Sequence, residues 1–170
     1  MKLDDLTSVI GALEEAGARY LVVGGVAVNA HGHMRATRDL DLVIQLERRN
    51  IERAVAALRG LGYRPMVPVD IDDLADAELR RVWREERNME VFSLVSDEHR
   101  QTPVDVFVSE PFDFDGAYRH SLEGELEAGV KMRFVALGTL IAMKEATGRA
   151  RDRADAAELR AIREQQGGAP

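Results

Sequence analysis

Two aspartates separated by one leucine, Asp39 and Asp41, constrain this 170-residue chain more than any other feature. They lie in the run Asp39–Leu46, which predicts a strand. Side chains two apart on a strand share a face, so both carboxylates point one way while Leu40 and Leu42 point into a core. Adjacent carboxylates repel each other unless a cation lies between them, and oxygen ligands suit Mg²⁺. The alternative interpretation is a solvated Asp-x-Asp pair without a ligand.

A third carboxylate stands in a second apolar run, Val104–Ser109, which also predicts a strand. Val104 and Val106 form its apolar face, and Asp105 shares the opposite face with Phe107. A strand does not need an aspartate among apolar residues for its stability, so Asp105 is a candidate ligand that would allow a two-metal site. The alternative is a charged residue that protects a sheet edge from aggregation.

The pair Gly24-Gly25 separates the β-rich run Arg19–Val23 from a predicted short helix, Val26–His31. Glycine lets backbone N–H groups approach a phosphate closely, and a helix N-terminus favours anions. Most such pairs are only turns, but the place of this one, shortly before Asp39, makes a phosphate site a useful hypothesis.

Basic and polar residues fill the segment between the glycines and the acidic pair. Arg35 and Arg38 either contact phosphates or pair with the aspartates, and we favour a substrate contact for Arg35. His31 and His33 are interpreted as polar side chains of a turn in preference to a transition-metal site.

The rest of the chain predicts alternating helices and strands. Helices are expected at 3–16, 48–61, 72–87, 137–147 and 152–165, and further strands at 64–69, 89–95 and 130–135. This order indicates a mixed α/β or α+β fold. We expect one domain over 1–166, with its core at 18–110, a C-terminal helical part at 137–165 and a loose tail at 167–170.

Composition excludes several classes of protein. The net charge of −7 argues against broad binding to a polyanion, so an acidic protein that handles phosphates needs metal ions or clustered basic residues. The absence of cysteine excludes disulfides and thiolate zinc sites. No apolar run approaches the roughly 20 residues that span a bilayer, and we expect a cytoplasmic protein.

The predicted helix at 137–147 carries an apolar stripe on which Lys144 also falls. A lysine there either runs past the core to solvent or reaches into a pocket, and we favour a pocket that binds a triphosphate. Asp152 precedes the last predicted helix and is expected to be its N-cap. Asp155 is expected to pair with Arg149 or Lys144 and so to lock the last two helices together.

The combined pattern resembles the signature of the polymerase-β-like nucleotidyltransferase superfamily, which is Gly-Gly or Gly-Ser, a spacer, Asp-x-Asp and a later Asp on a neighbouring strand. The Arg-x-Thr-x-Asp-x-Asp details look like small bacterial single-domain members related to abortive-infection-type toxins of toxin–antitoxin systems. The run Ala142–Leu159 is similar to the closing helices of that group. The resemblance covers 20–46, 103–109 and 134–160, whereas the middle, 62–100, matches no family.

The resemblance implies a twisted mixed β-sheet flanked by helices, and transfer of a nucleoside monophosphate from a nucleoside triphosphate such as ATP to an acceptor hydroxyl, with release of pyrophosphate. Gly24 and Gly25 would cradle the phosphates, and Asp39 and Asp41 would bind two Mg²⁺ ions, with Mn²⁺ as a substitute. Asp105 would bind the catalytic ion and help to activate the acceptor. The expected substrate contacts are Gly24, Gly25, Arg35, Thr37, Arg38 and Lys144.

The acceptor stays open between a small hydroxylated molecule such as an aminoglycoside, a protein side chain and a tRNA end, and an antitoxin partner is a further expectation. Known members often carry serine where this chain has Gly25, so only backbone donors remain there. The alternative is a non-catalytic protein that keeps the fold for binding a nucleotide or a partner. Intact Asp39, Asp41 and Asp105 disfavour it, because a degenerate site would tend to lose a ligand.

Overall fold

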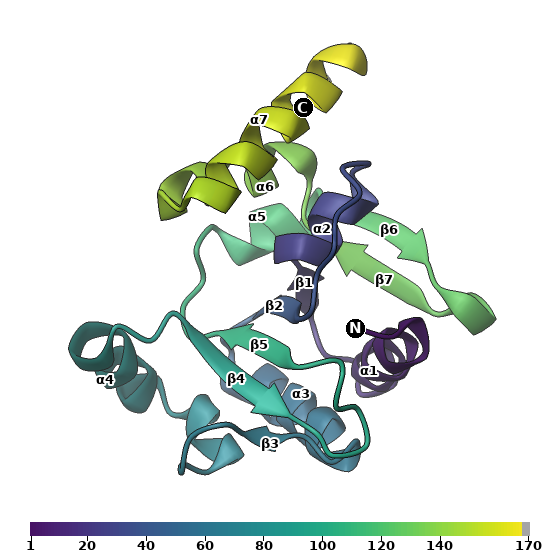
Figure 1. The fold of residues 1–170 in the computed structure, drawn as a ribbon. Helices are drawn as coiled ribbons and strands as arrows, with labels where there is room; N and C mark the ends of the chain where they lie inside the picture. The colour runs from purple at the N-terminus through teal and green to yellow at the C-terminus, as the bar shows by residue number, and fades with distance from the viewer. Residues whose placement is uncertain (168–170) are drawn as a thin grey trace.

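A seven-stranded mixed β-sheet runs through the protein in the order β3-β4-β5-β2-β1-β7-β6. The computed structural model describes residues 1–167 (Figure 1). The strands are β1 (Tyr20–Val22), β2 (Leu40–Ile44), β3 (Arg64–Pro65), β4 (Val91–Val95), β5 (Val104–Phe107), β6 (Leu122–Glu125) and β7 (Lys131–Phe134). β2 runs antiparallel to β1 but parallel to β5, and β7 runs parallel to β1. The predicted mixed α/β fold is confirmed.

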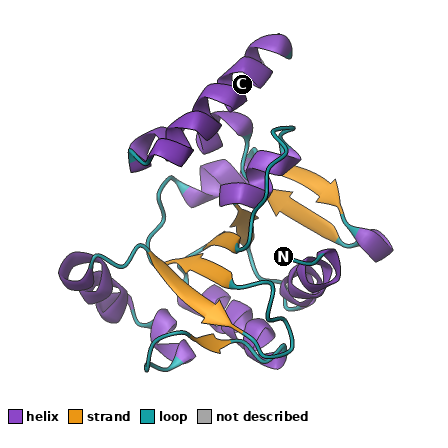
Figure 2. Cartoon of the chain, in the orientation of Figure 1, coloured by secondary structure: helices purple, strands orange, loops and turns teal. Residues whose placement is uncertain are grey.

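Seven α-helices and two short 3₁₀ turns of the described residues surround the sheet (Figure 2). The helices are α1 (Leu3–Glu15), α2 (Gly24–Ala30), α3 (Arg48–Gly60), α4 (Ala77–Arg87), α5 (Phe114–Arg119), α6 (Leu137–Thr147) and α7 (Ala150–Gln165), and the turns are η1 (Ile71–Ala75) and η2 (Glu127–Gly129). α6 packs against α7 and α2 at one end of the molecule, and α1 packs against α3 at the other. No helix within residues 1–167 is long and apolar enough to cross a membrane.

Alternating burial on β2 and β5 fixes which face of the sheet carries the acidic residues. Leu40, Leu42, Val104 and Val106 are fully buried in the core, whereas the intervening aspartates are half-buried on the opposite face. Burying each such aliphatic side chain contributes about 1.5–3 kcal/mol. A one-residue slip of either strand would place an aspartate in this core, so the core determines the register.

The structure corrects the predicted helix at 72–87, which is a 3₁₀ turn followed by α4. Asp76 lies between them in an extended conformation, and its side chain accepts hydrogen bonds from the N–H groups of Glu78 and Leu79. This N-cap ends one helical segment and begins another. Trp83 of α4 is buried and stacks on Phe92, with ring centroids 5.1 Å apart, and so anchors α4 to the sheet.

Three elements are not predicted from the sequence: α5, β6 and the short turn η2. β6 pairs antiparallel with β7 at the edge of the sheet, and most of its residues are exposed. Of the tail expected at 167–170, only Gly167 belongs to the described part of the chain, where it lies in a turn, and 168–170 lie outside it.

Candidate active site

Three aspartates meet where β2 and β5 lie side by side. Asp41 of β2 is the register partner of Asp105 of β5, and Asp39 immediately precedes β2. Register partners on parallel strands project to the same face, so the sheet holds these two side chains next to each other. All three aspartates line one cavity of about 700 Å³.

The pKa values of Asp41 and Asp105 reflect their burial and crowding. The pKa of Asp41 is raised to about 6, first by burial and then by the negative charges of Asp39 and Asp105, against the lowering effect of the Gly25 N–H and of Lys144. Burial also raises the pKa of Asp105; the Ser93 hydroxyl lowers it, and Asp39 again raises it. Both groups are therefore held in surroundings that disfavour their charged form.

Gly24 and Gly25 allow the start of α2 to approach the aspartates closely. Gly24 has a φ of +59°, and a Cβ there would lie 1.8 Å from Oδ2 of Asp41. A Cβ on Gly25 would lie 2.3 Å from Oγ1 of Thr37. Atoms this close overlap, so any larger residue at either position must displace the carboxylate or the hydroxyl that lines the cavity.

Basic side chains close the cavity on the side of α6 and α7. Nε and Nη2 of Arg35 donate to the two carboxylate oxygens of Asp155 at 2.9 and 2.8 Å. Nζ of Lys144 donates to Asp152 at 2.6 Å and lies 3.1 Å from Asp155. Lys144 and Asp155 are almost fully buried, so this network ties both helices to the segment that precedes β2.

Two expectations for the C-terminal helices change in the structure. Asp152 is not the N-cap of α7, because this helix begins at Ala150 and places Asp152 in its first turn, where it accepts hydrogen bonds from Lys144 and Thr147. Asp155 pairs with Lys144, which is one of the two partners predicted for it, and it also pairs with Arg35. Although burial raises the pKa values of Asp152 and Asp155, these hydrogen bonds bring both below their ordinary value.

The structure brings together every predicted site residue except one. Gly24, Gly25, Arg35, Thr37, Asp39, Asp41, Asp105 and Lys144 all line the cavity. Arg38 is exposed and is not part of its lining. Thr37 donates from Oγ1 to Oδ1 of Asp39 at 3.2 Å, which orients that carboxylate.

Sequence reasoning missed several lining residues. The cavity also includes Glu90, Phe107, Pro111, Phe112, Met143, Arg149 and Arg151. Phe107 had a usable signal, because it shares a strand face with Asp105. Arg151 had none, because its contact with the carbonyl oxygen of Ala36, at 2.7 Å, joins distant parts of the chain.

The three aspartates fit a divalent cation by the chemistry of their donors. Within residues 1–167, no three carboxylate or imidazole groups already converge as a metal centre. Asp39 and Asp41 instead accept hydrogen bonds from Thr37 and Gly25. Anionic oxygen atoms are the ligands that Mg²⁺ prefers, and a cation would offset both the burial of the Asp41 carboxylate and its repulsion by Asp39 and Asp105, the causes of its raised pKa.

No protein-family model matches the sequence, and no curated protein matches it. The fold is similar to that of the lincosamide antibiotic adenylyltransferase LnuA in its lincomycin-bound crystal structure, with a TM-score of 0.60 and 14% identity over 94% of this chain and 96% of LnuA. It is also similar to ANT(2″)-Ia in complex with adenylyl-2″-tobramycin, with a TM-score of 0.58 and 16% identity over 96% of this chain and 88% of that one.

A solution structure of ANT(2″)-Ia, described as an antibiotic-resistance factor, gives the same TM-score of 0.58 and covers 83% of that chain. At 14–16% identity these likenesses show the fold. The chain therefore has the fold of antibiotic nucleotidyltransferases, in agreement with the fold that its sequence resemblance implied.

Proposed function

We propose that this protein is a nucleotidyltransferase that transfers a nucleoside monophosphate from a nucleoside triphosphate to a hydroxyl group of a small molecule, with release of pyrophosphate. The observation that carries the proposal is the register pairing of Asp41 with Asp105 beside Asp39, in a cavity that also contains Gly24 and Gly25. The fold shared with two adenylyltransferases supports the same reaction class.

Asp39 and Asp41 would hold two Mg²⁺ ions, or Mn²⁺ in their place, and Asp105 would share the ion nearest the acceptor. Bound divalent ions polarise a triphosphate and favour loss of the acceptor proton. In the transfer, the acceptor oxygen forms a bond to the α-phosphorus while the bond to the departing pyrophosphate breaks. The acceptor proton would pass to Asp105, the carboxylate proposed to lie beside the acceptor.

The phosphates would lie against the start of α2. Gly24 and Gly25 carry no side chain, so their backbone would stay open to the phosphates while it lies against Asp41 and Thr37. Arg35 and Lys144 would face the phosphate oxygens while Asp152 and Asp155 keep their positions, and Thr37 would keep Asp39 oriented. Exposed Arg38 would contact only a part of the ligand that extends out of the cavity.

Part of the lining suits a small acceptor. Phe107, Phe112 and Met143 provide apolar surface in the cavity, and Glu90 adds a negative charge. The similar structures contain small molecules, which are lincomycin in LnuA and adenylyl-2″-tobramycin in ANT(2″)-Ia. The net charge of −7 disfavours tRNA as the acceptor.

A toxin of a toxin–antitoxin system is the second candidate, and it rests on the sequence resemblance of the Arg35–Asp41 segment. It would modify a protein or tRNA and would need an antitoxin partner. We favour the small-molecule acceptor because the lining described above joins the metal site to an apolar wall within one cavity. We place the reaction in the cytoplasm, where nucleoside triphosphates and Mg²⁺ are abundant.

The test begins with isothermal titration of each nucleoside triphosphate with Mg²⁺ into the wild type and into Asp39→Ala/Asp41→Ala. We expect Mg²⁺-dependent binding that disappears in the double variant, whereas exposed Asp97→Ala behaves as the wild type. Radiolabelled nucleotide is then offered with lincosamides, aminoglycosides, tRNA and protein. Labelling of a small molecule supports the proposal, labelling of tRNA or protein supports the toxin, and binding without transfer supports a non-catalytic protein.

A further inference from the structure

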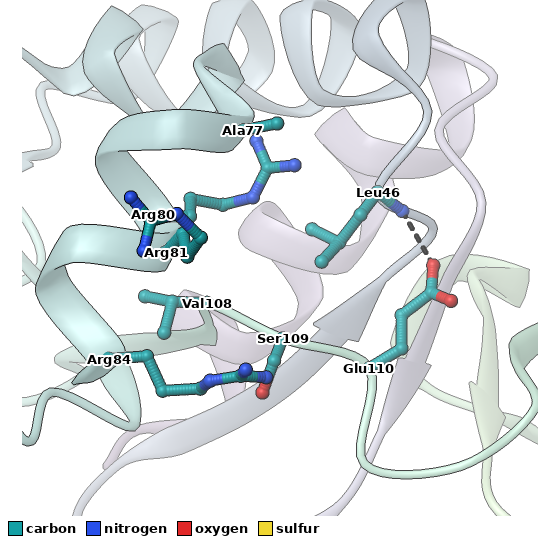
Figure 3. Close-up of a pocket in the computed structure, with 8 residues that line it drawn as sticks. All are labelled: Leu46, Ala77, Arg80, Arg81, Arg84, Val108, Ser109 and Glu110. Carbon is teal, nitrogen blue, oxygen red and sulfur yellow. Dashed lines mark hydrogen bonds between the residues drawn. The ribbon is translucent and has the colours of Figure 1, made fainter.

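A second, smaller cavity of about 270 Å³ lies between α4 and the segment that follows β5. Figure 3 shows three arginines of α4, Arg80, Arg81 and Arg84, on the same side as Val108, and Glu110 on the opposite side. Ser109 also lines the cavity. Leu46 and Ala77 complete the lining. None of these residues lines the cavity that contains the three aspartates.

Arg80 is the unusual member of this set, because only 8% of its surface is exposed. Its Nη1 donates to the carbonyl oxygen of Leu74 at 2.6 Å, and among residues 1–167 it forms no salt bridge. Burial lowers the pKa of Arg80, while Asp76 and Glu110 raise it. An arginine stays protonated in proteins, so the structure buries a cation that forms no salt bridge and feels the charges of Asp76 and Glu110 only from a greater distance, an arrangement that a closer anion would stabilise.

The other charged groups that line the cavity form ion pairs or hydrogen bonds within the protein. Arg81 is paired with Glu78 and Glu85, whereas Arg84 is exposed and lies 3.7 Å from Glu85. Glu110 accepts a hydrogen bond from the Leu46 N–H at 2.8 Å. The guanidinium groups of Arg80 and Arg84 therefore outnumber the single acidic group of the lining.

We propose that this cavity binds a phosphate group, either as free phosphate or as the monoester of a small molecule. Guanidinium groups bind phosphate oxygens through paired, charge-assisted hydrogen bonds, and the Ser109 hydroxyl is a further donor in the lining. The site stands independently of the proposed transfer reaction. It lies next to the catalytic cavity, because Phe107 and Pro111, on either side of the Val108–Glu110 segment, line that cavity.

The experiment is a titration of the ¹⁵N-labelled full chain, without divalent metal, followed by two-dimensional NMR. Inorganic phosphate and ribose 5-phosphate are added in separate series, with chloride at equal ionic strength as the control. We expect saturable shifts of the Ser109 amide and of the Nε–H groups of Arg80 and Arg84. The Gly24 and Gly25 amides report separately on phosphate in the catalytic cavity.

Arg84→Gln removes an exposed arginine of the cavity without disturbing buried Arg80, and should weaken binding about tenfold. Arg87→Gln, an equal loss of charge on the same helix outside the cavity, should leave the affinity unchanged. Saturation by phosphate identifies the free ion as a ligand, and tighter saturation by ribose 5-phosphate identifies the ester. Absence of saturable shifts at Ser109, or equal weakening in both variants, would overturn the site.

Discussion

Asp41 and Asp105 are direct register partners on two parallel strands, with the pairs Leu40–Val104 and Leu42–Val106 on either side of them. The aspartates are thus held together by the backbone ladder and by burial of their neighbours on the opposite face, although their charges repel. The core stabilises an arrangement of acids that would not form by itself.

Replacing Asp105 with asparagine should remove one anionic ligand and the proton acceptor while keeping the size of the side chain. We expect the rate of nucleotidyl transfer to fall about 10²–10⁴-fold, the usual range for loss of a general base. The measurement is the steady-state rate with saturating Mg²⁺ and the acceptor identified by the screen. Asp97→Asn, in an exposed position, serves as the control, and an Asp105→Asn enzyme with near wild-type rate would refute the assigned role.

Replacing Gly24 with alanine should damage both stability and nucleotide binding. The new Cβ would overlap Oδ2 of Asp41, and the φ of +59° is unfavourable for a residue with a side chain. We expect a loss of about 1–3 kcal/mol in the free energy of unfolding, measured by urea denaturation. Gly60→Ala is the matched control, because Gly60 ends α3 with no atom near its Cβ, and it should be neutral or slightly stabilising. Equal effects of the two substitutions would contradict the close approach.

The stability of the metal-free protein should depend on pH through Asp41. Its pKa is raised from 3.8 to about 6 in the folded protein, so the folded state binds its proton more tightly than the unfolded state does. Stability therefore falls as the pH rises through the window from about 4 to 6, by about 2–3 kcal/mol for this group. Denaturation curves at a series of pH values with chelator present measure it. In Asp41→Asn this component should vanish, and an unchanged pH profile in that variant would contradict the assignment.

Replacing Asp155 with asparagine should loosen the attachment of α7. Asp155 is 2% exposed and accepts from Arg35 and Lys144, so the change leaves two cations with a weaker partner. We expect a loss of about 3 kcal/mol in the free energy of unfolding, together with a higher KM for nucleotide. Glu158→Gln, an exposed change on the same helix, should stay within about 0.5 kcal/mol of the wild type. A stable Asp155→Asn protein would show that the network contributes little.

Local pattern was enough to predict β2 and β5, although Asp39, the first residue of the predicted strand, immediately precedes β2 in the structure. The pairing of Asp41 with Asp105 was different, because no local spacing says which strands become neighbours in a sheet. It was expected only through the resemblance to a known family. The buried position of Lys144 followed from the helical stripe, whereas its partners Asp152 and Asp155 depend on how α6 and α7 cross.

The errors have local physical causes. The sequence does not predict β6, because apolar and polar residues hardly alternate in the run Leu122–Glu125. This strand stays mostly exposed at the edge of the sheet. The prediction of a single helix at 72–87 failed because Asp76 caps the start of α4 and so separates this helix from the 3₁₀ turn before it. The start of α7 was placed two residues late, because an aspartate is a common N-cap and Asp152 was assigned that role, whereas Arg149 occupies the position in the structure.

The contact of Arg35 with Asp155 joins residues that are 120 positions apart. During synthesis, the strands with Asp41 and Asp105 emerge from the ribosome before α7 does, because α7 follows them in the chain. A nascent chain at that stage can form most of the sheet, yet it lacks the carboxylates that hold Arg35 and Lys144 beside the cavity. The ability to bind nucleotide should thus arise late in biosynthesis, after the last helix docks, and contacts so distant along the chain also form slowly during refolding.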